Sequence, residues 1–318
     1  LHARNVDLIT RTVERRLALL PKPSRLPFLK KLLPGRRAPV EPVVDGFRLV
    51  EGELRHQSPR VFREDPLRLM RVFLYGQQRG ARLHPDTAQL LRSELRLVNS
   101  DFLANDHVHE SFREILSQRG NVAPALRAMH EVDFLGKYLP EFGKLTCLVQ
   151  HEFFHIYTAD EHTLMCIQKL DDIWAGRLAN ATPYQELFQQ IERPFILYLA
   201  LLLHDTGKSA QGKHHEQDSA KLAERVADRL KLDGTATHSL RLLVEHHLAI
   251  IQISQRRDLD DPAVVRHFAA LVQTPENLHR LTLHTLADSL GTSDKLWNGF
   301  KDRSEEHTSE LQSHSDLV

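Results

Sequence analysis

Apolar residues recur at helical spacing along most of this chain, and strand-like alternation is scarce. The spacing predicts helices over 6–20, 86–98, 107–117, 121–129, 235–248 and 278–290, with a helical segment over 134–142 that Pro140 interrupts. Asp65 and Pro66 predict an N-cap and first position of another helix, and Asp160 predicts the N-cap of a helix running through Ile173. Weak alternation over 44–54 predicts a short hairpin or an irregular stretch. The pattern therefore favours an all-α fold.

Changes in composition divide the chain into four segments. Residues 1–43 predict a remnant helix and a basic, proline-rich linker, 44–145 a helical domain, and 146–302 a second helical unit. Residues 303–318 are polar and aperiodic, and the letters of 303–313 look like the conceptual translation of a sequencing adapter. We therefore expect the natural reading frame to be interrupted near Asp302 and exclude this tail from any site.

Composition narrows the class of protein. Lys plus Arg and Asp plus Glu both total 42 in 318 residues, so no global charge recruits nucleic acid or an anionic membrane. The longest apolar run is far shorter than the roughly 20 residues that span a bilayer. Two cysteines are too few for a disulfide framework and fit a reducing compartment, so a cytoplasmic protein is expected. The unusual number is 20 histidines, which suggests metal or proton chemistry.

A His-Asp pair follows the most apolar segment of the sequence. His204 and Asp205 come directly after the run Phe195 to Leu203, which predicts a buried helix, and Gly207 breaks that helix. Adjacent side chains at such a break can both turn toward one metal ion. The pair alone is weak evidence, because it occurs by chance in many chains.

Further histidines and aspartates stand in order on either side of this pair and strengthen the metal hypothesis. The candidate ligands are His162, His204, Asp205, His215, His247 and Asp288, with His214 and His246 open as alternatives to their neighbours. Mixed imidazoles and carboxylates suit Mn²⁺, Fe²⁺, Zn²⁺ or Co²⁺, whereas Mg²⁺ prefers oxygen. Asp205 could bridge two ions, and a divalent ion makes water acidic enough to attack phosphorus near neutral pH. The pattern predicts a metal-dependent phosphohydrolase with one or two ions.

Three basic residues near these positions have two readings each. Lys208 could neutralise a phosphate oxygen or a leaving group, and it could equally be a solvated loop lysine. Arg256 and Arg257 follow the predicted helix that carries His247 and could hold a phosphate or an acidic patch of a partner. The alternative for the arginines is local pairing with nearby aspartates.

The order His, His-Asp, Asp resembles that of the HD superfamily of phosphohydrolases. More narrowly, the strings over 155–163, 254–262, 286–288 and 296–298, and the preceding stretch 62–73, resemble the bifunctional PII uridylyltransferase/uridylyl-removing enzyme family. The resemblance covers about residues 44–302. It implies a helical linker domain before an HD-type helical bundle, and hydrolysis of a uridylyl–tyrosine phosphodiester on the PII signal protein. It also implies His162, His204, Asp205 and Asp288 as metal ligands and Mn²⁺ or Mg²⁺ as the metal, with Fe²⁺ and Zn²⁺ as further options. From their positions in the sequence, Asp205 and Lys208 are the predicted catalytic residues.

Two parts of that family are not found in the sequence. We find no Gly-Ser motif followed by paired aspartates, so we expect no uridylylation, and no stretch for paired glutamine-sensing ACT domains, so glutamine control is expected only in an intact parent protein. Two other functions stay open. One is an HD phosphohydrolase acting on a free nucleotide, an alarmone or a cyclic dinucleotide, and the other is a non-catalytic helical regulatory module.

Overall fold

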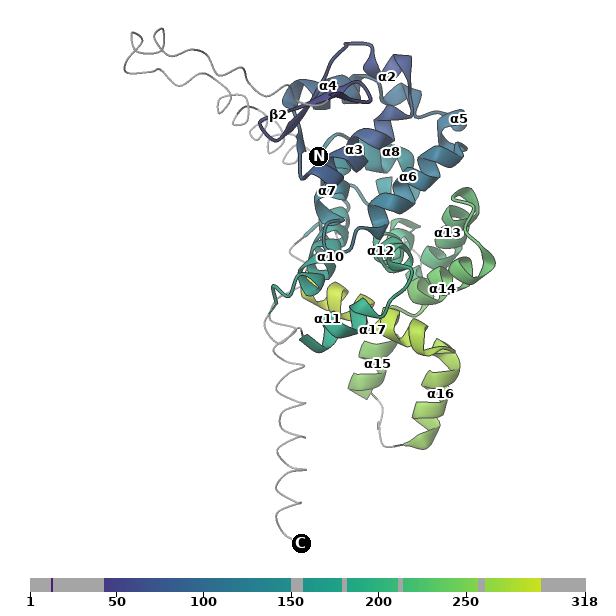
Figure 1. The fold of residues 1–318 in the computed structure, drawn as a ribbon. Coiled ribbons are helices and arrows are strands. Elements are labelled where there is room, and N and C mark those ends of the chain that lie inside the picture. The colour runs from purple at the N-terminus through teal and green to yellow at the C-terminus, as the bar shows by residue number, and fades with distance from the viewer. Residues whose placement is uncertain are drawn as a thin grey trace, which may run out of the picture.

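The computed structural model describes Val13 and residues 43–149, 157–178, 182–210, 214–256 and 261–292 (Figure 1). Three predicted segments lie outside these residues: the helix over 6–20 except for Val13, the basic linker, and the tail 303–318. Within the described part of the chain, helices account for nearly all regular structure, which confirms the all-α prediction. No helix in these ranges has the length and apolarity needed to cross a bilayer.

A small sheet opens the described chain, and it contains the hairpin predicted over 44–54. Its strands pair in the order β1 (Val43–Val44), β2 (Phe47–Val50), β3 (Glu53–His56) and β4 (Arg82–Leu83). The first three strands are antiparallel, and β4 runs parallel to β3. Glu51 and Gly52 join β2 to β3 with φ values of 50° and 80°, the two positive angles of a tight hairpin turn. Phe47 and Leu54 anchor the sheet on the core of the first helical unit.

The first helical unit follows the sheet. Its elements are α2 (Val61–Glu64), α3 (Arg68–Arg79), α4 (Pro85–Ser93), η2 (Leu95–Leu97), α5 (Ser100–Leu103), α6 (Asp106–Ser117), α7 (Ala123–Glu131), α8 (Phe134–Tyr138) and α9 (Pro140–Gly143). The predicted cap at Asp65 is two residues too early, because Leu67 is the N-cap and α3 begins at Arg68. Asp65 Oδ1 instead accepts a hydrogen bond from the Leu67 N–H at 3.0 Å, in the turn that precedes the helix.

The second helical unit holds the His-Asp pair. Its elements are α10 (Ala159–Trp174), α11 (Thr182–Gln189), α12 (Pro194–Leu203), η3 (Thr206–Ala210), α13 (His215–Arg229), α14 (Gly234–Glu245), α15 (Ala249–Arg256), α16 (Pro262–Val272) and α17 (Pro275–Thr292). Every residue of α12 is buried, as its unbroken apolar sequence predicts. The helix packs against α6, α10, α14 and α17 (Figure 1). His204 is the C-cap that follows its last residue.

The two helical units share one apolar core and are joined by a buried carboxylate. Asp171 on α10 accepts a hydrogen bond from the Ala123 N–H at the start of α7, at 2.7 Å, and another from the Tyr198 hydroxyl on α12, at 2.6 Å. Burial raises the pKa of Asp171 to about 6, although the Tyr198 hydrogen bond acts in the opposite direction. The joint thus ties the first unit directly to the two helices that carry His162 and His204.

Candidate metal centre

The His-Asp pair lies where α12 ends and the chain turns tightly into η3. His204 is the C-cap of α12, and Gly207 follows within the turn. The Gly207 N–H donates to Ser219 Oγ at 2.8 Å, and a Cβ at Gly207 would come within 2.2 Å of the His215 carbonyl oxygen. Only glycine fits at this position without displacing α13. The break that the sequence places at Gly207 therefore also brings His215 close to Asp205.

Two imidazoles of the centre are oriented by backbone carbonyls. His204 Nδ1 lies 2.7 Å from the Leu201 oxygen, and His247 Nδ1 lies 2.8 Å from the Val244 oxygen. A carbonyl only accepts hydrogen bonds, so Nδ1 carries the proton on each ring and Nε2 is left as the potential ligand atom. His204 Nε2 is buried and makes no regular hydrogen bond among the described residues. Donation of Nδ1–H to a carbonyl is the usual arrangement of a metal-ligating histidine.

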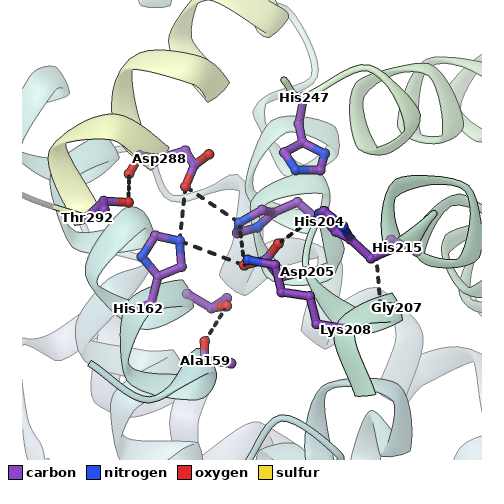
Figure 2. A network of polar contacts seen from close by, with 12 residues as sticks. Ala159, His162, His204, Asp205, Gly207, Lys208, His215, His247, Asp288 and Thr292 are labelled. Atoms are coloured by element: carbon purple, nitrogen blue, oxygen red, sulfur yellow. Dashed lines mark hydrogen bonds and ion pairs between the residues drawn. The ribbon is translucent and has the colours of Figure 1, made fainter. Parts of the chain in front are cut away.

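His162 and Asp288 close the centre from two other helices (Figure 2). His162 is the fourth residue of α10, Asp288 stands near the end of α17, and His162 Nε2 lies 2.9 Å from Asp288 Oδ1. The predicted N-cap at Asp160 is wrong, because Thr158 occupies the cap. Asp160 Oδ2 instead lies 3.1 Å from His130 Nε2 on α7, a contact that anchors the start of α10 to the first unit.

Asp205 occupies the middle of the cluster, and its two oxygens face different groups. Oδ2 lies 3.4 Å from His204 Nε2 and 3.9 Å from His162 Nε2, while Oδ1 lies 4.0 Å from His215 Nε2. The side chains form two overlapping sets of potential ligands, His162–His204–Asp205 and Asp205–His215–His247. Sharing of Asp205 between the sets is the arrangement expected of a carboxylate that bridges two cations.

Burial and mutual charge set the protonation of these groups. Burial alone would lower the pKa of His162 and His204, but the Asp288 and Asp205 carboxylates raise it above the ordinary histidine value. Burial likewise opposes ionisation of the two carboxyls, yet the neighbouring histidines hold the pKa of both below the usual range. Burial, with the charge of His204, lowers the pKa of His247 to about 4, so that ring is neutral at physiological pH. Two ionised carboxylates and a neutral imidazole form a set suited to a divalent cation.

The structure also separates the adjacent histidines that the sequence left open. His214 is exposed, whereas His215 faces Asp205 and has a side chain only 25% exposed. His246 is half-buried as the C-cap of α14, while His247 is buried beside His204, with ring centroids 5.2 Å apart. The predicted helix over 235–248 thus ends at Glu245, and His247 lies just beyond it. His215 and His247 are the members of each pair that join the cluster.

The structure describes the side chain of Lys208 but not those of Arg256 and Arg257. Lys208 Nζ lies 2.8 Å from Asp205 Oδ2, so the lysine is paired with the central carboxylate. Arg256 is the last residue of α15, and its side chain, like all of Arg257, lies outside the described part of the structure. The predicted contact of these two arginines with a partner stays a prediction.

Two further buried residues lie in the centre, and one of them, Cys166, had no predicted role in a site. Cys166 Sγ lies 3.5 Å from His162 Nε2 and 3.8 Å from Asp288 Oδ1, and burial raises the pKa of its thiol well above the ordinary value. His284 is fully buried, with its ring centroid 5.4 Å from that of His204. A signal for both existed, since Cys166 comes one helical turn after His162 and His284 one turn before Asp288. The position of His284 suggested that it could share a helix face with Asp288, although a surface or core histidine was the favoured interpretation.

The donor set fits a divalent metal ion. Imidazole nitrogens and carboxylate oxygens converge from α10, α17, the α12–η3 turn, the start of α13 and the end of α14 (Figure 2). Side-chain exposure is 2% or less for His162, His204 and Asp205, so the charge of Asp205 is shielded from water. A buried carboxylate cluster of this kind is stable only with positive charge nearby. Divalent metal binding accounts for the composition of the centre.

Comparison with known proteins agrees with this centre. Residues 47–138 match the family described as "Uridylyltransferase GlnD third domain", and residues 160–292 match the family "HD domain". Relatives named "Bifunctional uridylyltransferase/uridylyl-removing enzyme" include one from Phenylobacterium zucineum, 34% identical over 95% of this chain and 32% of its own. Another, from Ruegeria pomeroyi, is 34% identical over 86% of this chain and 30% of its own. The chain thus spans about a third of the length of these relatives.

Among solved structures, a CCA-adding enzyme in complex with CTP superposes with a TM-score of 0.50 at 20% identity. The match covers 79% of this chain and 49% of that enzyme. At this level of identity the likeness concerns the fold alone.

Proposed function

Because the chain belongs to the family of bifunctional uridylyltransferase/uridylyl-removing enzymes, of which it holds the third GlnD domain and the HD domain, we propose that it removes UMP from the uridylylated PII signal protein by metal-dependent hydrolysis. The observation that carries the proposal is the meeting of His162, His204, Asp205 and Asp288 in one buried cluster. We assign these four as metal ligands, with His215 and His247 completing a second position beside Asp205. Uridylylation and glutamine sensing belong to parts of the family that this segment does not span.

A divalent ion bound in the cluster would supply Lewis acidity, stabilising charge on the phosphodiester and making water acidic enough to serve as nucleophile. The family favours Mn²⁺ or Mg²⁺, while the imidazole-rich donor set also suits Fe²⁺ and Zn²⁺. The balanced reaction consumes one water, breaks the bond between phosphorus and the tyrosyl oxygen, and releases UMP and the free tyrosine side chain. Asp205, shared by both sets of ligands, is the residue on which the chemistry depends most.

The exposure of the side chains indicates the direction from which substrate approaches. Lys208 is 19% exposed and His215 is 25% exposed, whereas His162, His204 and Asp205 are almost inaccessible. The accessible side of the centre therefore lies at η3 and the start of α13. An incoming phosphodiester would meet the Lys208 ammonium there, where it can neutralise a phosphate oxygen. Such a rim allows a carrier protein to stay outside while its modified tyrosine enters.

The test is a comparison of substrates with purified protein and Mn²⁺. Uridylylated PII is incubated beside a panel of free nucleotides, an alarmone and a cyclic dinucleotide, and released products are quantified. We expect UMP from uridylylated PII with a far higher kcat/KM than any member of the panel. Preferential turnover of a free nucleotide would contradict the PII substrate and indicate an HD hydrolase that acts on free nucleotides. Failure to hydrolyse anything, with metal bound, would favour a regulatory module.

A further inference from the structure

The metal centre includes a sulfur atom that the chemistry proposed above does not use. Cys166 lies one turn after His162 on α10 and is completely buried. Its Sγ stands 3.5 Å from His162 Nε2 and 3.8 Å from Asp288 Oδ1, and those two atoms are 2.9 Å from each other. The three side chains thus form a third group of mutually close potential ligands, adjoining the group of His204 and Asp205.

These separations match what a tetrahedral ion would require. With Zn–S near 2.3 Å and Zn–N or Zn–O near 2.1 Å, ligand atoms around tetrahedral zinc stand roughly 3.3–3.6 Å from one another. The two sulfur distances lie at or just above this range, and the His162–Asp288 contact lies below it, as expected for a pair that is hydrogen-bonded to each other. Small rotations of the three side chains would suffice to admit a cation between them.

The backbone keeps the sulfur in this position. Gly291 of α17 packs directly on Cys166, and a Cβ at Gly291 would come within 2.5 Å of Sγ. Because Gly291 has no Cβ, the thiol fits directly against α17, beside His162 and Asp288. A second buried group also faces the same space, since His204 Nε2 lies 3.6 Å from Asp288 Oδ1 without a regular hydrogen bond among the described residues.

We propose that Cys166 supplies a thiolate ligand to a cation held between His162 and Asp288, which raises the affinity of this centre for thiophilic divalent ions such as Zn²⁺ and Cd²⁺ above that of a centre with nitrogen and oxygen donors alone. Coordination replaces the S–H bond by an S–metal bond and releases one proton to solvent, with no change in oxidation state. Thiolate ligands favour softer ions over Mg²⁺ and Mn²⁺, which bind through oxygen and nitrogen alone. The inference rests on the metal centre of the proposed function, but it concerns the ligand and not the hydrolysis.

The experiment reads the sulfur ligand directly. Metal-free protein comprising all 318 residues is titrated with Co²⁺, and the near-ultraviolet sulfur-to-cobalt charge-transfer band is recorded for wild type, Cys166→Ser and Cys166→Ala. Cys147→Ser is the matched control, because the chain contains only these two cysteines and Cys147 is partly exposed. We expect the band in wild type and in the control, and its loss in both Cys166 variants while Co²⁺ still binds through histidine and aspartate.

A second measurement tests selectivity. Competition titrations should show that Cys166→Ser weakens Cd²⁺ binding by about tenfold or more and changes Mn²⁺ binding by less than about threefold. Circular dichroism serves as the control that the variants stay helical. If either Cys166→Ala or Cys166→Ser misfolds, the other variant still tests the proposal. Co²⁺ binding to wild type without the charge-transfer band would overturn the thiolate ligand and leave the proposed hydrolase intact. Absence of any metal binding would overturn both.

Discussion

His162 Nε2 lies 2.9 Å from Asp288 Oδ1, and this contact joins the beginning of α10 to the end of α17. The two helices approach closely because Gly291, three residues after Asp288, packs on the backbone and side chain of Cys166. The geometry of the metal centre therefore depends on the packing of Gly291 against Cys166 as well as on the contact between His162 and Asp288. The first prediction tests that dependence.

Gly291→Ala should force α17 away from α10. The new methyl group would come within 2.5 Å of Cys166 Sγ and 3.1 Å of its backbone nitrogen, and overpacking of this kind typically costs about 1–3 kcal/mol of unfolding free energy. We expect that loss in urea denaturation, together with weaker Mn²⁺ binding in calorimetry.

Gly234→Ala is the matched control for this variant. A Cβ at Gly234, at the start of α14, would meet no atom within 4 Å. Alanine there should leave stability unchanged or raise it by up to about 1 kcal/mol. Equal losses in the two variants would show that the α10–α17 contact has no special role.

Lys208→Met should strengthen metal binding and weaken catalysis. The ammonium lies 2.8 Å from Asp205 Oδ2 and competes with a cation for that carboxylate. Its removal should tighten Mn²⁺ binding by roughly three- to tenfold, because one nearby positive charge is lost. Turnover should fall at saturating metal, since the phosphodiester loses its cationic partner. Lys221→Met, at an exposed position of α13 paired with Asp218, should change neither quantity. Weaker metal binding in Lys208→Met would contradict competition between the Lys208 ammonium and the cation for Asp205.

His215→Ala and His214→Ala form a matched pair at neighbouring positions. His215 Nε2 lies 4.0 Å from Asp205 Oδ1, whereas His214 is exposed. Loss of a metal ligand should lower kcat by at least about 100-fold and reduce the number of Mn²⁺ ions bound, while His214→Ala should behave like wild type. Metal content by plasma emission spectroscopy and steady-state kinetics provide the readouts. A larger defect in His214→Ala would mean that α13 begins in a different register.

Asp171 should make stability depend on pH between about 4 and 6. Its folded pKa, about 6, lies above the unfolded value of 3.8, so the folded state holds the proton more tightly. The stabilisation is fully present below about pH 4 and is lost as the pH rises through 6, a change of about 3 kcal/mol. As the pH rises through this range, wild type should therefore lose unfolding free energy relative to Asp171→Asn. A difference that is constant with pH would refute the raised pKa.

Much of the centre could be predicted from sequence because its signals are local. The apolar run before His204 dictates a buried helix, and Gly207 marks where that helix must end, so the position of the His-Asp pair follows from neighbouring residues. The same holds for most helices, whereas the weak alternation over 44–54 left a short hairpin and an irregular stretch as alternatives. His162 and Asp288 were identified by residue type and order on predicted helices.

The remainder depends on tertiary contacts that the linear pattern does not contain. The choice of His215 over His214 requires the exact start of α13, which the packing of Ser219 against Gly207 sets. Asp160 has the composition of an N-cap, but its carboxylate is used by His130 of the other helical unit. Cys166 has an ordinary helical position and becomes part of the centre only because α17 packs beside α10.

The most direct test of the account is single-turnover release of UMP from uridylylated PII by the metal-free protein, before and after addition of Mn²⁺, in wild type and His204→Ala. His204 Nε2 faces the centre while Nδ1 is held by the Leu201 carbonyl, so alanine removes a ligand and little else. We expect no release without metal, release of one UMP per modified tyrosine on adding Mn²⁺, and a rate at least about 1,000-fold lower in His204→Ala with its helical content retained. Metal-independent release, or wild-type rates in His204→Ala, would contradict it.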